Sequence, residues 1–214
     1  LDEYLKNKNG TYEISISKQA FSKQRQNLSP QIFIDIYKEY LEDFYQNYPK
    51  EVKKYKGYNI CAIDGSHVEI PNTIGLRSEY KASTNRADSR KVARAKVSGI
   101  YDVENGFMID ALITDGEEGE EKLAERNIEN AEKIINLKKS IIIFDRGYPG
   151  IQLLWYLEKK KAKYIMRLPK NSYKKERDEM KTEDEWLEIK ISGYRLNRLK
   201  DKELKEELKE KKKL

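Results

Sequence analysis

Five short apolar runs in the middle of this chain constrain its fold more than any other feature. Each run is four to eight residues long, which is the length of a strand rather than of a helix. The second and third runs are joined by a segment that ends in Asn-Gly, the strongest short-range signal for a β-hairpin. The fourth run is apolar at every position, as expected of a strand buried on both faces. The runs cover residues 58–63, 95–101, 107–114, 141–144 and 163–168.

Two amphipathic stretches separate the last three runs. Apolar residues between Ala124 and Ile135 recur at spacings of four, three and four, which places them on one face of a helix. Residues 151–157 predict a second helix. The resulting order is strand, two-stranded hairpin, helix, strand, helix, strand, and a buried strand requires helices on both sides of its sheet. We therefore predict an α/β fold with a ribonuclease-H-like mixed sheet flanked by helices.

The segments on either side of this middle zone differ from it in composition. Residues 1–56 predict a small helical N-terminal region, because Ser29 and Pro30 supply a cap and a first-turn proline before an apolar pattern. This region would serve DNA binding or packing. Residues 57–169 form the predicted core domain. Residues 170–214 are rich in Lys and Glu, which predicts either an exposed helix or a partly disordered segment.

The charge of the chain favours a polyanionic partner. The net charge is +6 and 37% of the residues are charged, although an AT-rich genome would also enrich Lys and Asn. The apolar runs are too short to cross a bilayer, and the N-terminus carries no secretory signal. The single cysteine, Cys61, excludes an internal disulfide and fits a reducing compartment. We expect a cytoplasmic protein with no membrane partner and with Cys61 in its core.

Asp64 and Asp145 occupy matching positions. Each follows an apolar run and is followed closely by glycine, in the sequences Ile-Asp-Gly-Ser and Phe-Asp-Arg-Gly-Tyr. Carboxylates at strand ends lie in the crevice where open α/β sheets bind ligands, and adjacent first and fourth strands would bring these two together. Two such carboxylates repel one another unless a cation lies between them, and Mg²⁺ prefers oxygen ligands. Turn formation would also explain either aspartate taken alone.

These motifs resemble transposases of the IS-four family of bacterial insertion sequences. The resemblance rests on Asp-Gly-Ser (residues 64–66), preceded by Lys-Gly-Tyr, and on Asp-Arg-Gly-Tyr (residues 145–148). Three further segments are similar to the family: Ala-Phe-Ser-Lys-Gln-Arg (20–25), Tyr-Asp-Val-Glu-Asn-Gly (101–106) and Tyr-Ile-Met-Arg-Leu-Pro (164–169).

The resemblance implies a ribonuclease-H-like catalytic core of the DDE type. In that family two Asp and one Glu hold two divalent ions, Mg²⁺ with Mn²⁺ as a substitute, which activate water or a DNA 3′-hydroxyl for attack on a phosphodiester. Carried over, Asp64 is the first catalytic metal ligand and Asp145 the second. The implied partners are double-stranded DNA, as terminal inverted repeats and target, and a second copy of the chain in a synapsed homodimer. The implied location is the bacterial nucleoid.

The third acidic residue of the family is missing from these 214 residues. Its Glu stands in a pattern of Tyr, two residues, Arg, three residues, Glu, six residues, Lys. Tyr164 and Arg167 open such a pattern, but Asn171 stands at the Glu position and Pro169 excludes a helix there. The chain also begins with Leu and stops inside a charged helical pattern. We therefore expect a C-terminally truncated core that is inactive as it stands.

A basic stretch between the first two strands is the predicted track for the DNA backbone, because phosphate contacts come mainly from Arg and Lys. A solvated loop would have the same composition. The only histidine, His67, is expected to have no role, and Asp102 and Asp110 are expected to be solvated acids of the hairpin. The predicted DNA-binding residues are Arg77, Lys81, Arg86, Arg90, Arg94, Lys96 and Arg146.

Two other functions stay open from the sequence alone. A non-catalytic remnant could bind element ends or pair with an intact transposase. A host nuclease could use the same fold. A downstream reading frame that encodes the Tyr-Arg-Glu-Lys pattern would favour the enzyme, whereas an immediate stop codon would favour the remnant.

Overall fold

The computed structural model describes residues 16–85, 88–197, 199 and 201–211. The chain divides into two compact units, with the boundary between Asn47 and Tyr48. Every strand belongs to the second unit. Across the residues that the structure describes, no helix is both long and apolar enough to span a membrane.

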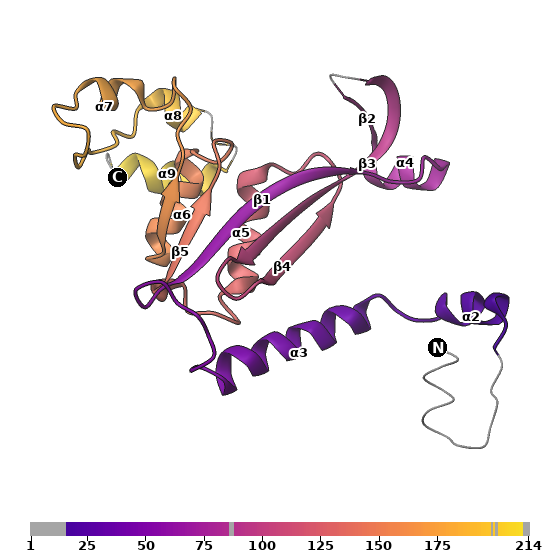
Figure 1. Cartoon of the computed structure of the whole chain (residues 1–214). Helices are drawn as coiled ribbons and strands as arrows, with labels where there is room; N and C mark the ends of the chain where they lie inside the picture. Colours follow the sequence, from indigo (N-terminus) through magenta and orange to yellow (C-terminus); the bar gives the residue numbers. More distant parts are fainter. Residues whose placement is uncertain (1–15, 86–87, 198, 200, 212–214) are drawn as a thin grey trace. The chain divides into compact units, whose positions relative to one another are not determined.

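The larger unit is built on one mixed β-sheet (Figure 1). Its strand order is β2-β3-β1-β5-β6, and β4 also pairs with β3. The β1–β3 and β3–β4 pairs are antiparallel, whereas the β1–β5 and β5–β6 pairs are parallel. Three antiparallel strands followed by two parallel ones are the predicted ribonuclease-H-like layout, so the fold prediction is confirmed. The strands are β1 (Asn59–Glu69), β2 (Ala82–Asn85), β3 (Asp88–Asp102), β4 (Phe107–Thr114), β5 (Ser140–Phe144) and β6 (Lys163–Met166).

Helices flank this sheet where the apolar periodicity predicted them. α5 contacts both β3 and β4, and its Leu123 and Ile128 side chains are fully buried. α6 contacts α5 and buries Leu153 and Leu157 completely. These apolar side chains complete the core together with those of the central strands. The helices of this part are α4 (Ile74–Tyr80), α5 (Glu120–Ala131) and α6 (Ile151–Lys160), with a short 3₁₀ turn at Leu137–Lys139.

A buried polar network joins α5 to the hairpin of β3 and β4. The Ser98 hydroxyl donates to Asn127 Oδ1 at 2.6 Å, and Asn127 Nδ2 donates to Asp110 Oδ2 at 2.9 Å. Asn130 Nδ2 donates to the same Asp110 oxygen at 3.2 Å. Asn127 is fully buried, so these bonds satisfy polar groups that would otherwise be costly inside the core. The network therefore fixes where α5 lies along the two strands.

The charged C-terminal segment forms three short helices that gather near α6 (Figure 1). Leu196 and Leu208 are buried in a cluster with Ile151 and Trp155 of α6. A salt bridge of 3.1 Å between Lys159 and Glu207 also links α6 to the last helix. The sequence left an exposed helix or a partly disordered segment open, and α9 is a largely exposed helix whose Leu208 packs against α6. These helices are α7 (Lys174–Asp178), α8 (Gly193–Asn197) and α9 (Lys202–Lys211).

The described part of the smaller unit, residues 16–47, contains the helices α2 (Lys18–Arg25) and α3 (Gln31–Asn47). The Ser17 hydroxyl caps α2 by accepting from the Ala20 N–H at 3.1 Å. The Ser29 hydroxyl accepts from the Gln31 N–H at the start of α3, where the cap was predicted. Leu41 is the buried residue of α3.

Candidate active site

Asp64 and Asp145 are neighbours because of the register between β1 and β5. Ile63 pairs with Phe144 in the last parallel pair of the two strands, and an aspartate follows each of them. β1 does not end at this point, because it continues to Glu69 in antiparallel pairing with β3. The prediction that Asp64 ends its own strand is therefore wrong. Asp64 lies where the neighbouring strand β5 ends, and both aspartates are exposed to solvent.

A third carboxylate, Glu120, approaches this edge of the sheet from the first residue of α5. A Cβ atom added to Gly147 would lie 2.8 Å from Glu120 Oε2, and one added to Gly65 would lie 3.8 Å from Glu120 Cγ. The glycines that follow the two aspartates therefore leave the space that Glu120 occupies. Glu120 was not among the predicted site residues, because acidic residues at a helix start are ordinary. The packing of α5 on the sheet is what brings it here.

The Tyr148 hydroxyl lies beside the same three carboxylates. Its side chain is 2% exposed, and its Oη lies 3.5 Å from the position that a Cβ on Gly65 would take. No described residue forms a hydrogen bond with this hydroxyl. Burial raises the pKa of Tyr148 well above its usual range, and the charges of Glu120, Asp64 and Asp145 raise it further. The phenol therefore keeps its proton, so its O–H group is a donor.

Two of the cations predicted to contact DNA are buried on β3. Arg94 is 6% exposed, and its guanidinium forms a salt bridge of 2.7 Å with Glu69. Lys96 is 7% exposed, and its ammonium donates to the Glu118 carbonyl at 3.0 Å. Lys96 Nζ also lies 3.7 Å from Glu120 Oε1. Because both cations are buried and have partners inside the protein, we do not propose that they contact DNA.

Arg77 and Lys81 lie at the end of α4, on the surface. Lys81 forms ion pairs with Asp115 and Glu117 just before α5. The hydrogen bond to Glu117 is the main reason that the pKa of Lys81 is raised. Arg77 is exposed, which suits a contact with a DNA phosphate.

Among the other three predicted DNA-binding residues, Arg146 is the one with a described side chain. Arg146 directly follows Asp145 and is exposed. Arg90 lies on β3, and its side chain is not among those described. Arg86 lies outside the described residues. Arg146 is thus the predicted cation that stands beside an aspartate of the site.

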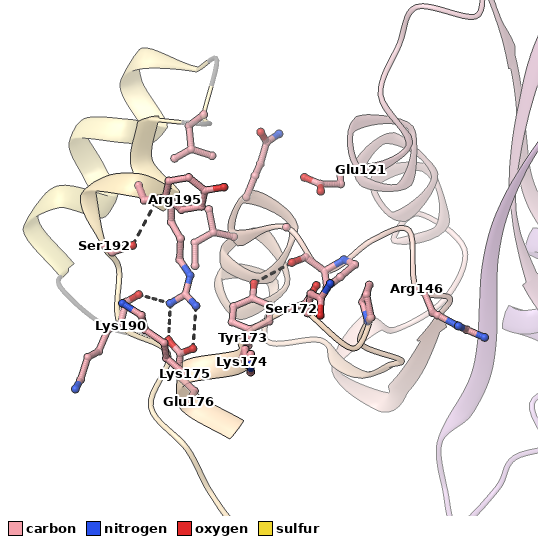
Figure 2. A pocket seen from close by; sticks show the side chains of 18 of the residues that line it. Glu121, Arg146, Ser172, Tyr173, Lys174, Lys175, Glu176, Lys190, Ser192 and Arg195 are labelled. Atoms are coloured by element: carbon pink, nitrogen blue, oxygen red, sulfur yellow. Dashed lines mark hydrogen bonds and ion pairs between the residues drawn. The ribbon is translucent and has the colours of Figure 1, made fainter. Parts of the chain in front are cut away.

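A pocket of about 1080 Å³ lies beside the loop that carries Asp145. One wall comes from Arg146 and the residues that lead into α6, and the other from the segment between β6 and α9 (Figure 2). Arg195 forms a bidentate pair with Glu176, at 2.7 and 3.0 Å, and its guanidinium stacks over the Tyr173 ring. In Figure 2 this pair and Arg146 lie on opposite sides of the pocket. Nothing in the sequence pattern pointed to this pocket.

Several sequence expectations about single residues can now be compared with the structure. Cys61 is fully buried, as expected of a core residue, and burial raises the pKa of its thiol to about 12. The expectation that Asp102 and Asp110 are solvated is wrong. Asp102 is fully buried and accepts hydrogen bonds from the backbone of the hairpin turn, and Asp110 is 9% exposed within the polar network. His67 is exposed on β1.

A comparison with sequence families matches residues 55–214 to the family described as Transposase DDE domain. The matched range covers the entire sheet and both aspartates. This chain belongs to the transposase DDE domain family. No curated protein matches its sequence significantly.

Solved transposase structures give weaker likenesses to this DDE domain. The Mos1 strand-transfer complex has a TM-score of 0.35 and 11% identity, and the matched region covers 79% of this chain and 57% of that one. The Mos1 paired-end complex with the left transposon end has a TM-score of 0.35 and 14% identity, over 80% and 58%. The Drosophila P element transposase strand-transfer complex has a TM-score of 0.31 and 7% identity, over 77% and 44%. The matched region covers between 44% and 58% of these proteins.

The carboxylates at this edge of the sheet suit a hard divalent cation by their chemistry. Asp64, Asp145 and Glu120 present oxygen donors, and the buried Tyr148 hydroxyl beside them has no protein partner among the described residues. Within the described ranges, no three His, Cys, Asp or Glu side chains stand close enough together to hold an ion in this arrangement. Coordination of one ion by all three carboxylates would therefore require a side-chain rotation.

Proposed function

We propose that this chain acts in cut-and-paste DNA transposition, by divalent-metal-dependent cleavage and strand transfer at the ends of a mobile element. The observation that carries the proposal is the position of Asp64 and Asp145. Both lie in the range that matches the DDE family, and the register of β1 and β5 makes them neighbours. Two acids at one rigid edge of a sheet suit a reaction in which the protein must place charge with precision.

The two aspartates would bind Mg²⁺, or Mn²⁺ in its place. A bound divalent ion supplies Lewis-acid stabilisation of the oxygens that carry charge during phosphodiester displacement. The contribution of Asp64 and Asp145 is to place carboxylate oxygens at a fixed point where β5 ends. The exposure of both side chains leaves this point open to a substrate as large as duplex DNA.

Exposed cations near the aspartates would hold the DNA backbone. Arg146 directly follows Asp145, and Lys174 and Lys175 line the neighbouring pocket. Arg77 lies further along the surface, on α4. These side chains would contact phosphates and fix the DNA relative to the acids without reading its sequence. The proposed partners are terminal inverted repeats, a target duplex and a second copy of the chain, in the bacterial cytoplasm at the nucleoid.

We further propose that cleavage needs the Glu of the Tyr-Arg-Glu-Lys pattern, which residues 1–214 do not contain. Single-turnover cleavage of a labelled element-end duplex tests this. The 214-residue chain should leave the DNA intact. Joining the Glu-bearing helix in cis, or adding it as a separate fragment, should give cleavage that depends on Mg²⁺ or Mn²⁺.

Substitutions separate the enzyme from the alternatives in that assay. In the cleaving protein, Asp64→Asn or Asp145→Asn should abolish cleavage, because the amide has nearly the same shape but carries no charge. Asp178→Asn, at an exposed acid of α7, is the matched control and should cleave normally. Cleavage that persists with both aspartates neutralised would refute the DDE assignment. Binding without cleavage under every condition would favour a DNA-binding remnant.

DNA binding by the 214-residue chain is a separate test. Affinity for duplex DNA should fall steeply as salt rises, because phosphate contacts release counterions. Arg146→Ala should weaken binding equally for different sequences and lower the salt slope by about 1. An affinity that is flat between low and high salt would contradict the proposed contacts.

A further inference from the structure

Glu120 is the carboxylate, besides Asp64 and Asp145, whose position at this edge of the sheet most needs an explanation. It begins α5, and the buried network of Asn127 with Ser98 and Asp110 anchors this helix on β3 and β4. This anchoring holds the Glu120 backbone in one place relative to the sheet. The side chain itself is 40% exposed, so it is free to change rotamer.

Two distances show that the Glu120 side chain lies beside the glycines that follow the aspartates. Glu120 Oε2 lies 2.8 Å from the Cβ position of Gly147, and Glu120 Cγ lies 3.8 Å from that of Gly65. Gly65 directly follows Asp64, and Gly147 is two residues after Asp145. The side chain of Glu120 therefore lies beside the two glycines that follow the aspartates.

The Tyr148 hydroxyl is an independent sign of a ligand at this point. Its side chain is 98% buried, and its Oη sits 3.5 Å from the same Gly65 position that Glu120 approaches. It forms no hydrogen bond with any residue that the structure describes. A buried hydroxyl without a partner destabilises the folded state, so native proteins rarely keep one unless a ligand or water uses it.

The present partner of Glu120 holds it loosely. Lys96 Nζ lies 3.7 Å from Glu120 Oε1, whereas a charge-assisted N–H···O bond is about 2.7–2.9 Å long. Lys96 keeps a closer bond of 3.0 Å with the Glu118 carbonyl, so it does not depend on Glu120. Asp64 Oδ1 accepts the Gly65 N–H at 2.8 Å, which leaves its second oxygen available. A divalent cation would offer these carboxylates a stronger counter-charge than Lys96 does.

We propose that Glu120, after a change of rotamer, joins Asp64 and Asp145 in binding one hard divalent cation in this chain, with the Tyr148 hydroxyl donating to the ligand shell. The inference rests on the proposed function for the role of the two aspartates, and it adds a third ligand from within the 214 residues. One ion is not the pair that strand cleavage requires, so binding here is compatible with the need for a later Glu. Glu120 makes the metal site of this chain partly independent of that residue.

Titration of the 214-residue chain with Mn²⁺, followed by the electron paramagnetic resonance signal of free Mn²⁺, tests the inference. The native chain should bind one ion. Glu120→Gln should weaken the affinity at least about tenfold, and so should Asp64→Asn. Glu129→Gln removes the same charge from an exposed position of the same helix, and it should bind Mn²⁺ within twofold of the native chain.

A variant of the tyrosine keeps every charge and tests the ligand shell. Tyr148→Phe should also weaken binding about tenfold while the circular dichroism of the chain stays native.

The outcomes separate this inference from the proposed function. If Asp64→Asn loses Mn²⁺ but Glu120→Gln binds like the native chain, the third ligand is wrong and the aspartate site stands. If the native chain binds no Mn²⁺, the inference is also wrong, and the cleavage assay with the later Glu still decides the function. If Glu120→Gln loses Mn²⁺ but Asp64→Asn does not, the ion lies elsewhere and both proposals fail.

Discussion

Asn127 should carry more of the stability of this fold than any other polar side chain of α5. It is fully buried and bonds to two strands at once, through Ser98 on β3 and Asp110 on β4. Asn130 lies one turn later on the same helix and donates to the same Asp110 oxygen, but it is only partly buried. Replacing each by Ala therefore compares two identical chemical changes in different surroundings.

The expected magnitudes follow from the bonds that each variant loses. Asn127→Ala removes a bond to a charged carboxylate, about 1.5–3 kcal/mol, and a neutral bond to Ser98, about 1 kcal/mol. The free energy of unfolding should fall by about 2.5–4 kcal/mol. Asn130→Ala should cost about 1 kcal/mol or less, because water replaces its longer bond to Asp110. The gain in helix propensity from Asn to Ala is the same in both variants and cancels in the comparison.

Urea unfolding monitored by circular dichroism measures this difference. The two variants should have the same slope with urea and different midpoints, since only stability changes. Equal losses from both substitutions, or a loss below about 1 kcal/mol from Asn127→Ala, would refute the account of how α5 is anchored. A weaker anchor would also affect the position of Glu120 at the start of the same helix.

Three further predictions concern other parts of the larger unit. Leu208→Ala should lower the free energy of unfolding by about 2–4 kcal/mol and expose residues 170–211 to limited proteolysis. Leu204 is only partly buried, so Leu204→Ala should lower the free energy of unfolding by less than half as much, and equal losses would contradict the packing of α9 on α6. Cys61 should react with a thiol reagent at pH 8 at least about a hundredfold more slowly in the native chain than in urea, because burial raises the pKa of its thiol to about 12. The stability that Cys61 adds relative to Ala should be complete below the ordinary pKa of a thiol and should decline as the pH rises from there toward 12. The Arg195 hydrogen bond lowers the pKa of Glu176, so this pair should add stability above the usual carboxyl range and lose it as the pH falls through the lowered pKa; a Glu176→Gln variant with the same acid sensitivity as the native chain would contradict this.

The order of the strands was predictable because buried strands and amphipathic helices differ in the period of their apolar residues. The hairpin at Asn105-Gly106 and the apolar strand before Asp145 are local signals, and both are confirmed. That β1 and β5 lie next to each other in the sheet was expected from the ribonuclease-H-like strand order and not from a local signal. Asp64 was placed at a strand end because the apolar run stops there, but antiparallel pairing with β3 continues through polar residues to Glu69.

Charge patterns were the weaker guide in the basic stretch. Arg94, Lys96 and Ser98 are buried on β3, and so are Ala93 and Ala95 between them, so both faces of this part of the strand are covered. The apolar run begins only at residue 95, and the cations in this stretch were therefore predicted to form a surface group. Their partners, Glu69 and the Glu118 carbonyl, come from elements that only the folded chain brings near.

Glu120 and the pocket beside Arg146 could not be predicted for a related reason. Glu120 belongs to an acidic run at the start of a helix, which has an ordinary explanation in the helix dipole. Its relation to the aspartates depends on how α5 packs across β3 and β4. The pocket likewise depends on the packing of the segment after β6 against α6, where apolar residues are too sparse to form a clear pattern.

Diffraction from crystals of this chain grown with Mn²⁺, recorded at a wavelength where manganese scatters anomalously, tests the central claim most directly. The account predicts an anomalous peak within coordination distance, about 2.0–2.4 Å, of carboxylate oxygens from both Asp64 and Asp145. Glu120 should provide a third oxygen to the same ion. A peak bound to other residues, or two aspartates that bind no ion at saturating Mn²⁺, would contradict the account.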